Sequence, residues 1–190
     1  MNVYNNFIPG TTLDLEKSGG ATGAEFLDKI FYISDGIMLS YIREISGIDG
    51  TTLQNWVKRG WVLNPVNKLY SKEQVARILI INMVRETMQL SKITYLLNYI
   101  NGEVSDKSDD IISESKLYDY ICRTVKEAKN NFGELETIIS EVTSDYRDRF
   151  EGAGERLRNA IKIILLAYNA SVFKASADIE MKAIEEKTNG

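Results

Sequence analysis

The side chains that could do chemistry in this chain are amides and cations on one short segment. Between residues 51 and 59, helical spacing places Leu53, Trp56 and Val57 on one face. The opposite face carries two amides and two cations: Gln54, Asn55, Lys58 and Arg59. Amides can pair with adenine edges, and cations with guanine or phosphate. The pattern indicates contacts to DNA, although any solvated helix face can have this composition.

Catalytic and metal-binding groups are scarce. Histidine is absent and Cys122 is the only cysteine, which excludes histidine bases, histidine ligands, an intrachain disulfide and a clustered-thiol metal site. The helical pattern around Cys122 predicts a buried structural thiol. The acidic run from residue 134 to 148 has no ligand-loop spacing, so we interpret it as a solvated face. We expect no catalytic residues, no cofactor, no metal and no enzyme activity.

Two short helices joined by a glycine turn surround the polar segment. The pattern predicts a helix over 39–46, a Gly-Ile-Asp-Gly turn and a second helix over 51–59 that starts at Thr51 or Thr52. This is the helix-turn-helix pattern, in which the second helix can lie in a DNA major groove. Turn-forming residues at 64–68 then predict a small β-hairpin wing with Lys68 at its tip.

A longer helix begins after the wing. Ser71 and Gln74 have the spacing of a capping box, with Ser71 as the N-cap. Ser91 is expected to cap a further helix, which ends at Asn101-Gly102. Residues 104–110 form a polar, acidic connector and mark the best internal boundary.

The formal charge of −4 is unevenly distributed. Residues 36–101 carry eight basic and four acidic side chains, whereas the segments on either side are both acidic. A local basic excess favours phosphate contact, because the field of a charge is screened over about 10 Å in moderate salt. The excess of four charges is modest, so it supports DNA binding without establishing it.

The segment 52–62, followed by 68–75, resembles the MerR-type winged helix. In that family the recognition helix ends in a glycine, a wing follows, and an aromatic residue precedes a Ser- or Thr-capped helix. Here those features are Gly60, Tyr70 and Ser71. The whole chain also resembles an uncharacterised bacterial family that carries the label of a domain of unknown function and has a MerR-like N-terminal half.

The resemblance implies a sequence-specific transcriptional regulator that binds double-stranded promoter DNA. The residues expected to enter the groove are Thr51, Thr52, Gln54, Asn55, Lys58 and Arg59. Lys68 and Tyr70 would support the wing, and Arg43 and Lys72 would meet flanking phosphates. Gln54 stands where most members have an arginine, and Asn55 replaces a common aromatic residue. The alternative is therefore a protein-interaction module that keeps the winged-helix fold without direct DNA binding.

The C-terminal half is expected to be helical over 113–131, 134–150 and 154–187. The second helix would extend its apolar stripe through Tyr146 and Phe150. The third has a broad stripe whose members are Leu157, Ile161, Ile164, Leu165, Tyr168 and Val172. The apolar surface continues nearly all round this helix through Ile163, Leu166 and Ala167, which predicts burial on several sides. Such a stripe can be a domain core, a homodimer seam or a small-molecule pocket.

These patterns predict an all-α chain: a MerR-like winged helix-turn-helix followed by a C-terminal helical bundle. We divide it into an N-terminal arm and short helix (1–35), the winged module (36–102) and a C-terminal core or dimerisation region (111–190). The arm is expected to be extended or mobile over 1–24, with a helix over 24–32 whose inner face includes Ile33. The apolar run 160–170 is too short to span a bilayer, and no secretory signal is evident. We therefore expect a cytoplasmic protein without a membrane partner.

Overall fold

The computed structural model describes residues 6–128 and 132–188. Its N-terminal part contains α1 (Gly23–Ile30), β1 (Ile37–Met38), α2 (Leu39–Ser46), α3 (Gly50–Lys58), β2 (Leu69–Tyr70), α4 (Lys72–Val84) and α5 (Leu90–Asn101). Its C-terminal part contains α6 (Glu114–Ala128), the 3₁₀ turn η2 (Phe132–Glu134), α7 (Leu135–Val142) and α8 (Ala153–Thr188). The two strands pair antiparallel and are the whole sheet within the described residues. The predicted all-α class is confirmed.

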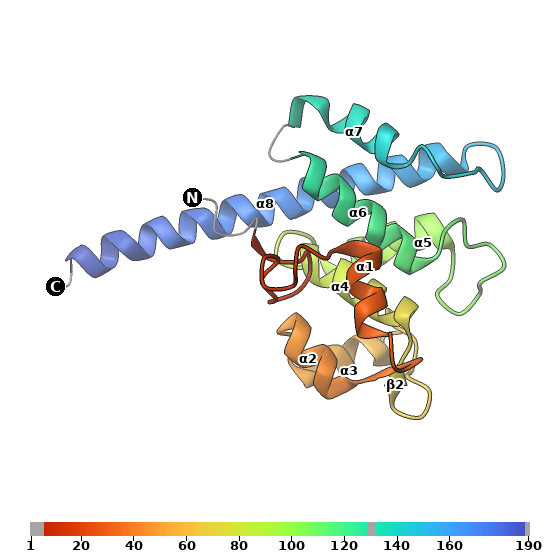
Figure 1. Ribbon diagram of the computed structural model, residues 1–190, viewed down its shortest axis with the longest axis horizontal. Coiled ribbons are helices and arrows are strands. Elements are labelled where there is room, and N and C mark those ends of the chain that lie inside the picture. Colours follow the sequence, from red (N-terminus) through yellow and green to blue (C-terminus); the bar gives the residue numbers. More distant parts are fainter. Residues whose placement is uncertain (1–5, 129–131, 189–190) are drawn as a thin grey trace.

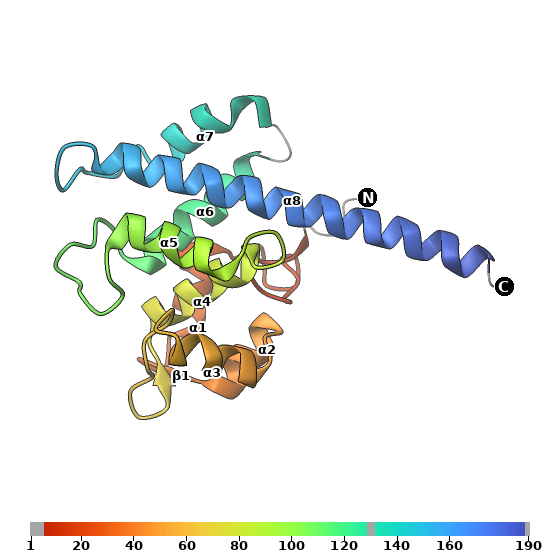
Figure 2. The same cartoon turned by 180° about the vertical axis from the view of Figure 1, so that it is seen from behind.

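The helices are arranged in three tiers (Figures 1 and 2). α2, α3 and the strand pair lie at one end, α1, α4, α5 and α6 lie in the middle, and α7 and α8 lie at the other end. α4 is the central helix, because it packs against α2, α5, α6 and α8. From Val75 to Ile81 every one of its residues is buried. One hydrophobic core therefore joins the winged end to the C-terminal helices.

The N-terminal segment is packed onto this core, so the expectation of an extended arm is wrong for residues 6–22. Ile8 and Ala21 have no exposed surface, and Tyr118 Oη donates a hydrogen bond to the Pro9 carbonyl at 2.7 Å. Gly10 has a φ of +77°, and a Cβ at that position would lie 2.3 Å from the Leu79 carbonyl oxygen. Only glycine fits this close approach to α4.

Several predicted helix boundaries are corrected. α5 begins at Leu90 with Gln89 as its N-cap, two residues before the expected Ser91 cap, but ends as predicted at Asn101 with Gly102 as the C-cap. α7 ends at Val142, so Phe150 does not continue its stripe and is 48% exposed. Ile33 lies beyond α1 and is 93% exposed. The last three residues of the helix predicted over 113–131 lie outside the described residues.

α8 is 36 residues long, and only its first half belongs to the core. The predicted stripe from Leu157 to Val172 is buried, but Ile163 and Leu166 are 43% and 49% exposed. The prediction of burial on several sides is therefore wrong. After Val172 no residue of α8 is buried, and this half projects beyond the other helices (Figures 1 and 2).

The length of α8 bears on the prediction that its apolar run is too short to span a bilayer. Within the described residues α8 is the one helix long and apolar enough to cross a membrane, with a hydropathy of 1.3 in its most apolar window. One-third of that window (33%) is buried inside the fold. The core helix of a soluble protein meets the same criterion, so length and composition alone are weak evidence for a membrane span.

Candidate nucleic-acid interface

Two local features, a C-cap and an N-cap, stabilise the turn between α2 and α3. Gly47 ends α2 in the left-handed conformation, with a φ of 69°, which costs little for a residue without a Cβ. Asp49 begins α3 as its N-cap: its Oδ1 accepts a hydrogen bond from the Thr52 backbone N–H at 2.9 Å. The hydroxyl of Thr52 also donates to Asp49. These bonds hold the pKa of the Asp49 carboxyl below its ordinary value.

The cap corrects the predicted start of α3. The helix begins at Gly50, and its N-cap is Asp49 instead of Thr51 or Thr52. The sequence contained this signal, because aspartate is a preferred N-cap residue and Thr52 stands at the third helical position. Thr52 is consequently half-buried and committed to the cap, whereas Thr51 is exposed.

The two faces of α3 are those that the sequence predicts. Leu53 and Trp56 are buried, with 0% and 1% exposure, and they fix the helix against the core. The polar set on the other face is exposed: Gln54, Asn55, Lys58 and Arg59. The Arg59 guanidinium carbon lies 5.2 Å from the centre of the Trp61 ring, a cation–π contact that anchors the side chain beside the helix end.

The wing is a tight hairpin turn on a two-stranded ladder. Val66 and Leu69 exchange backbone hydrogen bonds of 3.0 and 2.9 Å, and Asn67 and Lys68 between them have φ values of 52° and 65°. Positive φ at both central residues is the type I′ geometry of β-hairpins. The exposed Lys68 lies at the tip, as predicted. The partner strand β1 precedes α2 and was missed, because two residues leave no periodic signal.

The base of the wing is fixed by the start of α4. Ser71 Oγ accepts from the Gln74 N–H, and Gln74 Oε1 accepts from the Ser71 N–H at 2.9 Å, so the predicted capping box is confirmed. Gln74 Nε2 also donates to the carbonyls of Leu63 and Asn64, at 2.8 and 3.1 Å. One side chain thus caps the helix and holds the chain that enters the wing.

α3 and the wing line a common groove of about 460 Å³. Gln54 and Val57 contribute from α3, Lys68 from the wing tip, and Met38 and Ser40 from the start of α2. The structure therefore brings the predicted residues Gln54 and Lys68 together. Met38, which is 59% exposed, and Ser40 were missed, because nothing in a linear pattern relates the start of α2 to the wing.

The other predicted residues lie around this groove in different environments. Arg43 is exposed on α2. Lys72 forms an ion pair with Asp28 of α1 and is half-buried, so it is already engaged within the protein. Tyr70 is 3% exposed and supports the wing from the core side, and burial raises the pKa of its hydroxyl.

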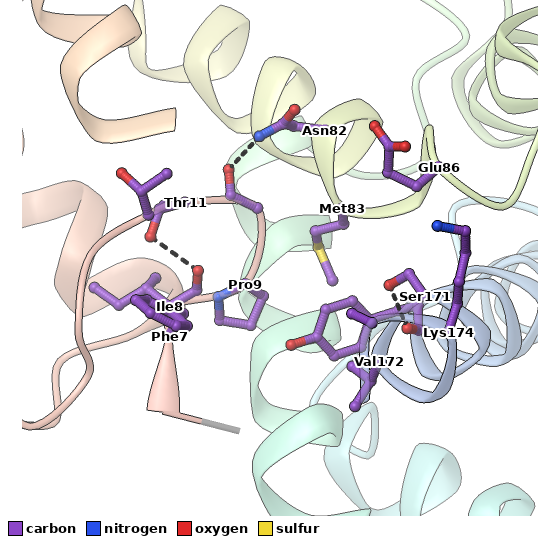
Figure 3. A pocket seen from close by; sticks show the side chains of 14 residues that line it. Phe7, Ile8, Pro9, Thr11, Asn82, Met83, Glu86, Ser171, Val172 and Lys174 are labelled. Carbon is purple, nitrogen blue, oxygen red and sulfur yellow. Dashed lines mark hydrogen bonds between the residues drawn. The ribbon is translucent and has the colours of Figure 1, made fainter. Parts of the chain in front are cut away.

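The end of α2 is tied to α4 and to the N-terminal loop by Asn82. Its Nδ2 donates to the carbonyls of Gly10 and Ser46, both at 2.9 Å. Figure 3 shows Asn82 beside an apolar cavity of about 450 Å³, with Pro9, Met83 and Val172 around it. These contacts fix α2, and through the glycine turn α3, relative to the body of the protein.

The segment that positions this interface belongs to a recognised family. Residues 26–121 match the model of a domain of unknown function, DUF1836. The chain belongs to the DUF1836 family. The DUF1836 match runs from α1 into α6 and so includes α2, α3, the wing and α4, but it does not reach α7 or α8.

A relative resembles a larger share of the chain than the family model covers. The chain is 28% identical over 163 residues to the uncharacterized protein YkrK of Bacillus subtilis (strain 168), which covers 75% of this chain and 70% of that protein. No solved structure matches the chain. Within residues 6–128 and 132–188, no three cysteine or carboxylate side chains are placed to hold a metal ion.

Proposed function

We propose that this DUF1836 protein is a sequence-specific DNA-binding transcriptional regulator with a MerR-like winged helix-turn-helix. The observation that carries the proposal is that Gln54, on the exposed polar face of α3, and Lys68, at the wing tip, line the same groove. In helix-turn-helix proteins the second helix lies in the major groove and the first crosses the backbone. A bound duplex would then meet Gln54 and Asn55 through base edges, and Lys58, Arg59 and Arg43 through phosphates.

The wing extends the same surface. Its type I′ turn exposes Lys68 at the tip, where the ammonium group can reach a flanking phosphate. Lys58 and Arg59 at the end of α3 provide two further cations, and residues 36–101 carry the basic excess of the chain. The interface therefore has the residue types required both for phosphate positioning and for base recognition.

A second copy of the chain is the partner that fits α8. Apolar residues recur on its exposed side at alternating intervals of three and four: Ile163, Leu166, Ala170, Phe173, Ala177 and, one heptad later, Ile184. This is the spacing of a coiled-coil seam. We propose a cytoplasmic homodimer through α8, which would present two α3 helices to a two-fold symmetric operator.

The experiment is a fluorescence-anisotropy titration with the promoter next to the gene, at several salt concentrations. Lys58→Ala/Arg59→Ala is expected to weaken binding at every sequence and to reduce the salt slope by about one per lost phosphate contact. Asn55→Ala is expected to relax sequence preference. Lys187→Ala at the far end of α8 removes a cation outside the interface and is the matched control. No binding by the wild type at low salt would contradict the proposal.

One observation favours a second function, a protein-interaction module that keeps the fold. Apolar side chains are exposed around the wing and the start of α2: Met38, Tyr41, Val66 and Leu69, with exposures of 59%, 40%, 73% and 39%. An apolar rim of this kind is typical of a protein contact. Affinity purification from the native host separates the two: a stoichiometric protein partner that Val66→Asp abolishes, without recovered DNA, would favour this alternative.

A further inference from the structure

A second cavity lies on the other side of the wing base from the proposed DNA-binding groove. It measures about 270 Å³ and is bounded by three segments: the entry to the wing, the start of α4, and the connector that leads into α6. Asn64 and Val66 line it from the wing, and Asp110 and Glu114 line it from the connector and α6. Its volume is near the lower limit for ligand sites, so it suits a small molecule.

The cavity contains a carboxylate that is only partly satisfied. Glu114 is 5% exposed, and its Oε1 accepts a charge-assisted hydrogen bond from Arg77 Nη1. Its Oε2 accepts no hydrogen bond from any described residue. A buried acceptor without a donor is destabilising by about 1–3 kcal/mol, and more when it is charged, so such an atom in a native fold needs an explanation.

Three contacts hold Arg77 in the orientation that leaves this oxygen without a donor, and its bond to Glu114 Oε1 is one of them. Its Nε donates to the Trp61 carbonyl at 2.7 Å, and its Nη2 donates to Asn98 Oδ1 at 3.1 Å. These bonds fix the guanidinium plane between α3's exit, α5 and α6. Turning the guanidinium toward Oε2 would break the bonds to Trp61 and Asn98, so this oxygen remains without a donor.

The charges around the cavity leave an excess of one negative charge. The carboxylates are Glu73, Asp110 and Glu114, and the cations are Arg77 and Lys107. Lys107 Nζ lies 3.6 Å from Asp110 Oδ2, and Glu73 accepts hydrogen bonds from the N–H and hydroxyl of Ser115. Burial raises the pKa of both Asp110 and Glu114, because desolvation disfavours the charged carboxylate.

We propose that this cavity binds a small organic monocation, an alkylammonium group, whose N–H groups donate to Glu114 and Asp110. One ammonium supplies the missing donor and neutralises the excess charge. An ammonium group can present three donors in a small volume, whereas an anion would meet two unfavourable carboxylates. A metal ion is a poorer match, because the described residues offer no group of three metal-binding side chains.

The bound cation would stabilise the base of the wing. Asn64 and Val66 line the cavity, and the Asn64 carbonyl is held by Gln74 from α4. A ligand that adds contacts to these residues restricts the wing, and binding that favours one wing geometry shifts its population. This regulatory role rests on the proposed DNA-binding function, but binding of the cation does not.

The test compares three probes of nearly equal size and different charge: n-butylammonium, 1-butanol and butyrate. Thermal denaturation of the full chain is followed as each concentration is raised at neutral pH, because a ligand of the folded state raises Tm by mass action. We expect n-butylammonium to stabilise the wild type, with weaker or no effect from the other two. Equal shifts by n-butylammonium and 1-butanol would overturn the proposal.

Variants locate the site. Glu114→Gln is expected to weaken n-butylammonium binding about tenfold or more, since it removes a charge-assisted hydrogen bond. Asp110→Asn leaves the Arg77–Glu114 ion pair intact, and we expect it to weaken n-butylammonium binding severalfold. This variant tests the site even if Glu114→Gln does not fold. Asp109→Asn, one residue outside the lining, is the matched control and should bind like the wild type. Unchanged affinity in both cavity variants would overturn the assignment.

A DNA titration with and without n-butylammonium separates this proposal from the proposed function. Cation binding with no DNA binding under any condition would leave the site intact and remove the regulator. DNA binding without stabilisation by n-butylammonium would support the proposed regulator and overturn the cation site.

Discussion

α3 exposes one face to solvent, whereas the outer half of α8 has no buried residue, and the exposed side chains of the two differ in chemistry. α3 exposes amides and cations beside a wing that adds another cation. The outer half of α8 exposes apolar side chains, among them Ile179, Met181 and Ile184 at 41%, 58% and 60%. The first surface matches phosphates and base edges, and the second matches an apolar partner. The two partners that we propose, DNA and a second copy of the chain, therefore correspond to surfaces of different chemistry.

The two helices also differ in how they are held. α3 has nine residues, and its position is fixed by the Asp49 cap, by buried Leu53 and Trp56, and by the glycine turn to α2. The outer half of α8 has no buried residue. An isolated helical segment of this length is marginal in water, so its stability depends on what covers it. The polar face of α3 is therefore pre-organised, whereas the outer half of α8 would gain order from the association that we propose.

The largest expected effect tests the contact between α4, which packs against α2 and α8, and α6. Arg77→Met leaves Glu114 buried without its cation, and we expect a loss of about 3–5 kcal/mol in the free energy of unfolding. Urea denaturation measures it. The double variant Arg77→Met/Glu114→Leu should recover most of the loss, because no unpaired charge remains buried. Equal losses in the single and double variants would show that the ion pair does not join α4 to α6.

The next effect tests the seam alone. Ile184→Glu places a charge on the apolar face of the outer half of α8, which is expected to weaken a homodimer at least about tenfold, or about 1.4 kcal/mol. Sedimentation equilibrium measures the association. Lys182→Glu introduces the same carboxylate on another face of α8 and is the control. A monomeric wild type, or equal effects of both variants on association, would contradict a homodimer through the apolar face of α8.

A smaller effect tests the pre-organisation of the winged region. Ser71→Ala removes one bond of the capping box and should lower the free energy of unfolding by about 1 kcal/mol. Because Gln74 also holds the wing entry, we expect faster hydrogen exchange at residues 63–69 than in the wild type. Ser71→Asp, another good N-cap, should restore both. A loss of stability without faster hydrogen exchange in the wing would show that the capping box does not hold the wing.

The smallest effect concerns pH. The pKa of Asp49 is lowered in the folded protein, so the stabilising cap is present above the unfolded-state pKa and is lost as the pH falls through the folded-state pKa. Asp49→Asn keeps a good cap that does not titrate. We expect nearly wild-type stability at neutral pH and a shallower decline in acid, measured by Tm between about pH 5 and 2. An identical decline would contradict this role.

Predictions based on local chemistry agreed closely with the fold. The bounds of α2, the capping box at Ser71 and the end of α5 at Gly102 were all predicted, because each depends on residues within one or two turns. The hairpin turn at Lys68 was predicted for the same reason. α7 was predicted too long, since an apolar stripe continues through Tyr146 and Phe150 whether or not the backbone remains helical.

The candidate sites were less accessible to prediction. The outward face of α3 follows from helical spacing alone, but the groove is also lined by Met38 from β1 and Ser40 from the start of α2. Tyr70 follows the exposed Lys68 by two residues in the sequence, yet it is buried. The cavity at Glu114 joins residues up to about fifty positions apart along the chain, and no spacing within one element relates them.

The sequence by itself determined the helical class, the glycine turn, the caps and the polar face of α3, because these depend on backbone preferences and on the period of one helix. Only the tertiary structure decided which apolar faces are covered. Ile161 is buried and Ile163 is exposed on the same helix, since a neighbouring helix packs on one side and none on the other. The same packing left Glu114 with one unsatisfied oxygen, which no local pattern specifies.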